Sequence, residues 1–171
     1  QELGRGGRDR LSCLSVMCIY KDDFSISFGR ISKKVMTTEK IIGRWNSMYH
    51  SSMSRRIGNR NYIDTSVKPS YATIDLIDDS PTSDADVNWN IYVIFFLRRY
   101  GLIKIVEVLT QTNKYIFVIE ILSEMLRICD THQIEMIDKY RTLEWEYYKD
   151  SFRTMKNTIR NSDNRCWSEM F

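Results

Sequence analysis

Two arginines near the start of the chain have the spacing to act on phosphate groups. Arg5 and Arg8 lie three residues apart in a segment whose glycines let the backbone approach a ligand closely. Each guanidinium is planar and always charged, so the pair can hold phosphate oxygens through two forks. A positioned arginine also stabilises the charge that accumulates during phosphoryl transfer. The pattern predicts arginine fingers, and the alternative is an exposed basic loop paired with Asp9, Asp22 and Asp23.

The residues around these arginines form a dense motif. Residues 1–9, QELGRGGRD, fit Q-x-x-G-R-x-G-R-D and precede an apolar decamer at residues 11–20. This segment resembles motif VI of superfamily 2 helicases, and its QE and final Asp are similar to the RecQ branch. The resemblance implies that Arg5 and Arg8 are catalytic. It also implies that the nucleotide-contacting set is Gln1, Gly4, Arg5, Gly7, Arg8 and Asp9.

Two departures mark the chain as a divergent relative of that branch. Gly6 and Arg10 stand where RecQ proteins usually have Ala and Gly, and the four cysteines show no CxxC spacing, so the RecQ zinc module is missing and no metal site is expected. The sequence also has no G-x-x-x-x-G-K-[ST] and no acidic motif II. We therefore expect a C-terminal fragment of a longer helicase, inactive alone, whose N-terminal lobe binds ATP and Mg²⁺.

The charge distribution favours a nucleic-acid partner for the first part of the chain. Residues 1–60 hold 12 Lys or Arg against 5 Asp or Glu, whereas residues 61–171 hold 13 against 17. Aromatic Trp45 and Tyr49 lie among the cations, as on a surface that follows phosphates, although an ordinary solvated helix face fits as well. The candidate DNA-contacting residues are Lys33, Lys34, Arg55, Arg56, Arg98, Arg99, Lys104 and Lys114.

Several elements must position these residues. The apolar decamer at residues 11–20 reads as a strand buried on both faces, as in a parallel sheet. Helical spacing over residues 32–56 predicts one helix that starts near Thr37 and ends at residues 57–59. A short extended piece is expected around residues 62–64, and the acidic residues 78–86 predict a linker.

The second half of the chain has the order helix, hairpin, helix. Residues 89–100 predict a helix capped by Gly101, and residues 102–109 and 115–121 predict two strands around a polar turn. A helix followed directly by a hairpin is typical of a winged helix. Apolar positions then recur every three or four residues to about Arg160, which predicts one long helix or two abutting ones, with a possible break at residues 130–131.

The expected fold class is the α/β end of a RecA-like helicase lobe followed by a mainly α winged-helix region with a β-hairpin. The expected domains are the lobe end at 1–28, a helical connector at 29–80, the winged helix at 81–122 and a helical segment at 123–171. The function this implies is an ATP-dependent, RecQ-like DNA helicase. The alternative is a stand-alone winged-helix DNA-binding or protein-interaction domain without catalytic activity.

Neither a membrane-spanning segment nor a histidine metal site is expected from the sequence. The longest uncharged stretch, residues 87–97, is shorter than the roughly 20 apolar residues that cross a bilayer, so no membrane partner and a cytoplasmic location are expected. His50 and His132 have no neighbour at metal-ligand spacing and read as surface or partly buried residues.

Overall fold

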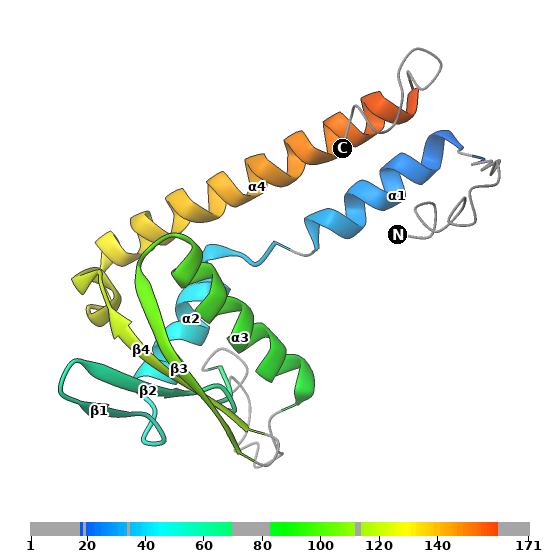
Figure 1. Ribbon diagram of the computed structural model, residues 1–171. Coiled ribbons are helices and arrows are strands. Elements are labelled where there is room, and N and C mark those ends of the chain that lie inside the picture. Colours follow the sequence, from blue (N-terminus) through cyan, green and yellow to red (C-terminus); the bar gives the residue numbers. More distant parts are fainter. Residues whose placement is uncertain (1–17, 19, 34, 70–82, 112–113, 161–171) are drawn as a thin grey trace, which may run out of the picture. The chain divides into compact units, whose positions relative to one another are not determined.

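The computed structural model describes residues 18, 20–33, 35–69, 83–111 and 114–160 (Figure 1). It divides the chain into two compact units, residues 35–150 and residues 1–34 together with 151–171. The elements in chain order are α1 (Lys21–Ser32), α2 (Thr38–Tyr49), β1 (Arg55–Ile57), β2 (Arg60–Asp64), α3 (Asp84–Arg99), β3 (Ile103–Gln111), β4 (Lys114–Ile121), the 3₁₀ turn η3 (Glu124–Arg127) and α4 (Thr131–Arg160). Mixed helix and strand content is confirmed.

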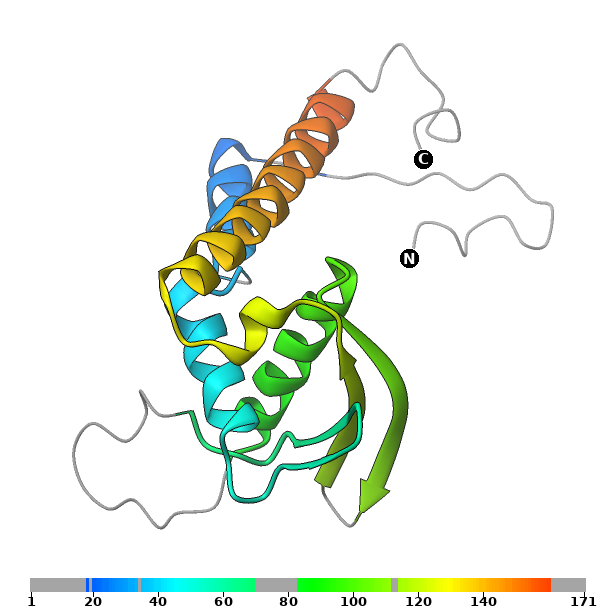
Figure 2. The same ribbon diagram turned by 90° about the vertical axis from the view of Figure 1, so that its left-hand side faces the viewer.

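The unit of residues 35–150 is built on one antiparallel sheet with the strand order β1-β2-β4-β3. Helices α2 and α3 pack together on one face of this sheet (Figures 1 and 2). The face toward the helices carries Ile63, Ile119 and Phe117, which are buried with Trp45 of α2 and Val93 of α3. Strand β2, from the expected connector, therefore pairs directly with the hairpin that was expected to form a winged helix.

Local signals account for several of these boundaries. The hydroxyl of Thr37 accepts a hydrogen bond from the Lys40 backbone N–H at 3.4 Å and starts α2, as predicted. Ser83 caps α3 in the same way through Asp86, so the last residues of the expected acidic linker belong to a helix. Gly101 follows α3 with φ 68°, which confirms the predicted glycine at its C-terminal end. The hairpin of β3 and β4 is also confirmed.

The single helix expected over residues 32–56 is wrong. Helix α2 ends at Tyr49, and the Ser54 hydroxyl donates to the carbonyl of Met48, one of the last backbone groups of the helix, at 2.6 Å. The chain then turns back as the β1–β2 hairpin. Gly58 has φ 59° at the first central position of its two-residue turn, the backbone conformation that tight hairpins require. A glycine of this kind suits a helix end and a hairpin turn equally, which explains the error.

The 3₁₀ turn and α4 complete this unit. The indole N–H of Trp45 donates to the backbone carbonyl of Leu126 at 2.8 Å, so η3 is fixed against α2. The Thr38 hydroxyl donates to Asp138 Oδ1 at 2.7 Å, which joins α2 to the first half of α4. Asp130 Oδ1 accepts from the Gln133 backbone N–H at 3.0 Å, and this cap explains the break expected at residues 130–131.

The other unit pairs α1 with the last turns of α4. The rings of Phe28 and Phe152 have centroids 5.2 Å apart, and the cationic ends of Lys156 and Arg160 lie 5.7 and 5.6 Å from the centroid of the Phe24 ring. Of the strand expected at residues 11–20, only Cys18 and Tyr20 are described, and neither is in a strand. Within the described residues, no helix combines the length and apolar character that a membrane span needs.

Candidate nucleic-acid interface

A cationic cavity of about 370 Å³ lies at the β1 edge of the sheet. Among the described residues that line it, three are arginines and none is a carboxylate, so the cavity favours an anion. Its lining residues are Tyr49, His50, Ser54, Arg55, Arg56, Asn61, Ile63 and Arg127.

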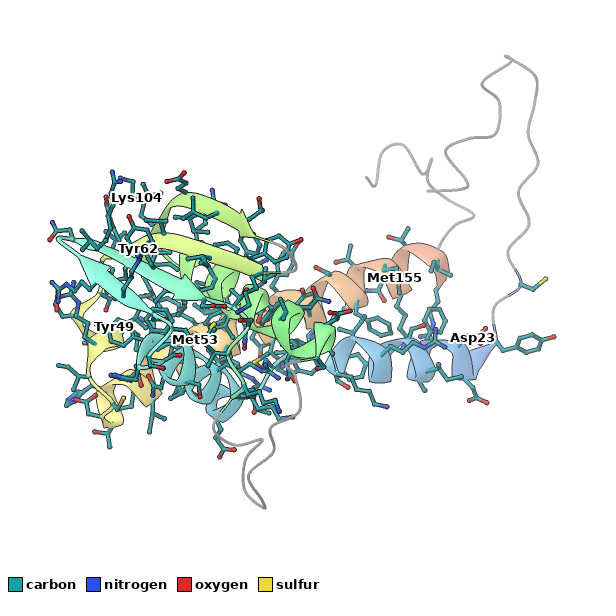
Figure 3. The ribbon with its side chains drawn as sticks, turned by 90° about the horizontal axis from the view of Figure 1, so that it is seen from below. Asp23, Tyr49, Met53, Tyr62, Lys104 and Met155 are labelled. Atoms are coloured by element: carbon teal, nitrogen blue, oxygen red, sulfur yellow. The ribbon has the colours of Figure 1, made fainter. Side chains whose placement is uncertain are left out.

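The hairpin register decides which side of the sheet each residue faces. Arg56 is the partner of Asn61, and because direct partners share a face, both lie on the side that α2 covers. Arg55 is the partner of Tyr62 on the opposite side, where its guanidinium lies 4.8 Å from the Tyr62 ring centroid. Figure 3 shows Tyr49 and Tyr62 on either side of the hairpin. The two adjacent arginines therefore approach the cavity from different sides of the edge strand.

Contacts within the hairpin hold the two arginines in place without neutralising them. Arg56 Nε donates to the Gly58 carbonyl at 3.2 Å, so this side chain bends along the turn. The cation–π contact of Arg55 with Tyr62 likewise brings no negative charge to it, and the described lining of the cavity contains no carboxylate. Two positive charges therefore remain at the mouth of the cavity.

Two buried donors of the cavity lining lack acceptors in the described part of the chain. Asn61 is 3% exposed, and its Nδ2 makes no hydrogen bond there. Arg127 pairs through Nη1 with Glu124 at 3.3 Å, but its buried Nε is also unsatisfied. An unsatisfied buried donor costs about 1–3 kcal/mol, so a bound acceptor would restore stability at this point.

A cysteine and a histidine meet beside the cavity. Cys129 Sγ lies 3.6 Å from His50 Nε2, and the edge of the His50 ring packs against Tyr49. The sequence separates these two residues by 79 positions, so their spacing gave no signal. The predicted exposure of His50 and His132 is confirmed. No group of three or more potential metal ligands occurs among the described residues.

The structure brings together only some of the predicted DNA-contacting residues. Arg55 and Arg56 share the cavity, whereas Lys33 lies in the other unit, at the end of α1. Residues Gln1, Gly4, Arg5, Gly7, Arg8, Asp9 and Lys34 lie outside the described part of the chain.

The cations of the α3–β3–β4 segment are dispersed. Arg98 is exposed in the last turn of α3, where positive charge also stabilises the helix end. Lys104 Nζ pairs with Glu120 Oε2 at 3.2 Å (Figure 3). Lys114 starts β4 opposite Gln111, and the length of β3 separates it from the Arg98 end by about 26 Å. These residues do not form one continuous patch.

Arg99 lines a second cavity, of about 440 Å³, whose lining contains the carboxylate of Glu144 as well as the Arg99 guanidinium. The buried carboxylate of Glu144 accepts from Arg99 Nη1 at 3.0 Å and from the Tyr92 hydroxyl at 2.5 Å. Burial and the hydrogen bond to Glu144 raise the pKa of Tyr92 far above its usual range. Because Arg99 is already paired, this cavity attracts anions less than the cavity at β1.

Arg44 holds two helices together and does not contribute to an exposed cationic surface. Its side chain is buried, pairs with Asp86 at 2.8 Å and donates to Asn90 Oδ1 at 2.9 Å, which joins α2 to α3. Burial alone would raise the pKa of Asp86, but hydrogen bonds from Arg44 and Ser83 outweigh burial and lower it. Arg127, which is not among the predicted DNA-contacting residues, lies in the lining of the cationic cavity.

Comparisons with known proteins return no relatives: no protein-family model, no curated protein and no solved structure matches this chain.

Proposed function

We propose that this chain is the nucleic-acid-binding C-terminal part of an ATP-dependent, RecQ-like DNA helicase. The helicase assignment rests on residues 1–9, where Arg5 and Arg8 would act as the arginine fingers of motif VI. ATP and Mg²⁺ would be held by an N-terminal lobe, since the Walker motifs are absent from the sequence. The finer fold assignment, a RecA-like lobe end followed by a winged helix, belongs to the same proposal.

The observation that carries the DNA-binding part is the cationic cavity at the sheet edge. Arg55, Arg56 and Arg127 surround a concave surface whose described lining contains no carboxylate. Arginine forks match the geometry of phosphate oxygens, and such contacts supply most sequence-independent affinity for nucleic acid. In a helicase, a site of this kind would hold the strand while the motor advances.

A second candidate function is a stand-alone DNA-binding or protein-interaction domain. The observation that favours it is that β2 and β4 pair directly and share one core with α2 and α3, so residues 35–150 form a compact unit with the cavity on its own surface. The ATPase of the full-length parent distinguishes the two candidates.

In the full-length parent, Arg8→Ala or Arg5→Ala should lower DNA-stimulated ATP hydrolysis about a hundredfold or more while nucleotide binding persists, because the fingers act on the transition state. Lys139→Ala on the exposed side of α4 is the matched control. Near-normal turnover in both arginine variants would contradict the helicase assignment and leave the stand-alone domain.

A further inference from the structure

The cavity at the β1 edge has a buried floor as well as a charged rim. Asn61 and Ile63 lie on the inner face of β2 and are almost completely buried, while Arg55 and Arg56 are exposed on β1. A ligand group that reaches the Asn61 amide must therefore enter a recess. An internal phosphate of a continuous strand carries a sugar on both sides, which hinders that entry.

The donors around the recess outnumber what an internal phosphodiester accepts. Asn61 Nδ2 and Arg127 Nε are buried without acceptors in the described residues, and two further guanidinium groups stand at the rim. A phosphodiester offers one negative charge, whereas a phosphate monoester carries about −1.5 to −2 and three strong acceptor oxygens.

The charge around the cavity also favours a phosphate monoester over an internal phosphodiester. Three arginines contribute to the cavity, and among the described residues one carboxylate, Glu124, compensates one of them by pairing with Arg127 at 3.3 Å. The remaining charge of about two matches a monoester dianion. The His50 ring and the Ser54 hydroxyl, which donates to the Met48 carbonyl, complete the polar lining.

We propose that this cavity binds the terminal phosphate of a nucleic-acid strand, with Asn61 and Arg127 donating at the floor and Arg55 and Arg56 supplying positive charge at the rim. The proposal rests on the function proposed above, because the strand is the ligand assigned there. The site would then bind the ends of nucleic-acid strands selectively, in addition to contacting phosphates in general.

The test compares three single-stranded oligonucleotides of one sequence that carry a 5′-phosphate, a 3′-phosphate or no terminal phosphate. Each phosphorylated strand carries its dye at the end opposite the phosphate, and the unphosphorylated strand is measured with the dye at either end. The full chain is titrated by fluorescence anisotropy at one salt concentration. We expect one phosphorylated oligonucleotide to bind about tenfold more tightly than the unphosphorylated one, the effect of one or two charge-assisted hydrogen bonds. Inorganic phosphate in millimolar excess should remove that difference.

Two variants assign the difference to the cavity. Asn61→Asp keeps the side-chain shape but replaces the donor by a carboxylate, and Arg127→Gln removes the positive guanidinium group without touching the core of the sheet. Both should bind the three oligonucleotides equally, while Lys139→Gln, at an exposed position of α4, should retain the preference. Circular dichroism checks that each variant is folded.

The outcomes separate this inference from the function on which it rests. Salt-sensitive binding that is equal for all three oligonucleotides would overturn the terminal-phosphate site and leave DNA binding intact. A preference that survives in both Asn61→Asp and Arg127→Gln would also overturn it. Failure of all three oligonucleotides to bind would overturn both proposals.

Discussion

Arg56 and Asn61 are direct register partners in the β1–β2 hairpin, so a guanidinium and a buried amide lie on one face of the sheet at the edge of a cavity. The register depends on the two-residue turn at Gly58, because a slip by one residue would move Asn61 to the other face. The turn therefore determines the geometry of the proposed phosphate site as well as the hairpin.

Gly58→Ala tests that dependence. A Cβ at Gly58 meets no atom within 4 Å, so the cost comes from the φ of 59° alone, and we expect a loss of about 1 kcal/mol in unfolding free energy. Gly29→Ala is the matched control, since that glycine is helical and equally unobstructed, and it should stabilise its helix by about 0.5–1 kcal/mol. Equal effects of the two substitutions in urea denaturation would contradict the turn assignment.

Asp86→Asn should reveal the ion pair between α2 and α3. Removing the carboxylate takes away the 2.8 Å ion pair of the buried Arg44 guanidinium with Asp86, and we expect a loss of about 2 kcal/mol at pH 7. Asp84→Asn, in the same first turn but exposed, should change stability by less than about 0.5 kcal/mol.

The same pair predicts an acid-sensitive contribution to stability. Because the folded pKa of Asp86 is lowered from 3.8, its contribution is complete above that value and is lost as the pH falls through the folded pKa. The difference in unfolding free energy between the wild type and Asp86→Asn should therefore shrink between about pH 5 and about pH 2, the range over which such a carboxylate titrates. A difference that is constant with pH would contradict the ion pair.

At high pH, we expect the ionisation of Tyr92 to lower the stability of the folded chain. Its raised pKa means that the folded chain keeps the phenol proton after the unfolded chain has lost it, so stability is complete below pH 10 and declines above it. Because burial also raises the pKa of Tyr100, ultraviolet titration should show at least one tyrosine fewer ionising in the wild type than in the urea-unfolded chain near pH 11, about one unit above the ordinary tyrosine pKa. Tyr92→Phe should reduce that difference by one tyrosine.

Trp45→Phe should loosen the 3₁₀ turn that carries Arg127. The substitution keeps most of the buried aromatic volume but leaves the Leu126 carbonyl without its indole donor, at a cost of about 1–3 kcal/mol. Because Arg127 follows Leu126 in η3, binding of the phosphorylated oligonucleotide should weaken as well. Trp89→Phe on the partly buried side of α3 serves as a control whose binding should remain unchanged.

The sequence predicts this fold best where the signals are local. The cap at Thr37, the glycine at Gly101 and the β3–β4 hairpin follow from residues within a few positions of one another. The β1–β2 hairpin was missed because Gly58 fits either a helix end or a turn, and because Arg60–Asp64 gains its stability from β4, more than 50 residues later.

In the candidate site, too, only the residues with a local signal could be predicted from the sequence. Arg55 and Arg56 could be selected from their charge, but the cavity also needs Asn61, which has no distinctive spacing, and Arg127, which reaches it only because η3 packs against Trp45. The position of Arg44 between two helices is equally hidden in the sequence, since its partner Asp86 lies 42 residues away. Such long-range contacts leave no periodic pattern in the sequence.

The most direct test of the account is the salt dependence of DNA binding by the chain with Arg55→Glu and Arg56→Glu. The control pair Lys40→Glu and Lys139→Glu changes the net charge equally at exposed positions of α2 and α4, away from the cavity lining. We predict that the arginine pair weakens binding in fluorescence anisotropy and reduces the slope of log affinity against log salt by about 2, while the lysine pair preserves both. Equal effects of the two pairs, or unchanged affinity in the arginine pair, would contradict the assignment of the β1 cavity as the nucleic-acid site.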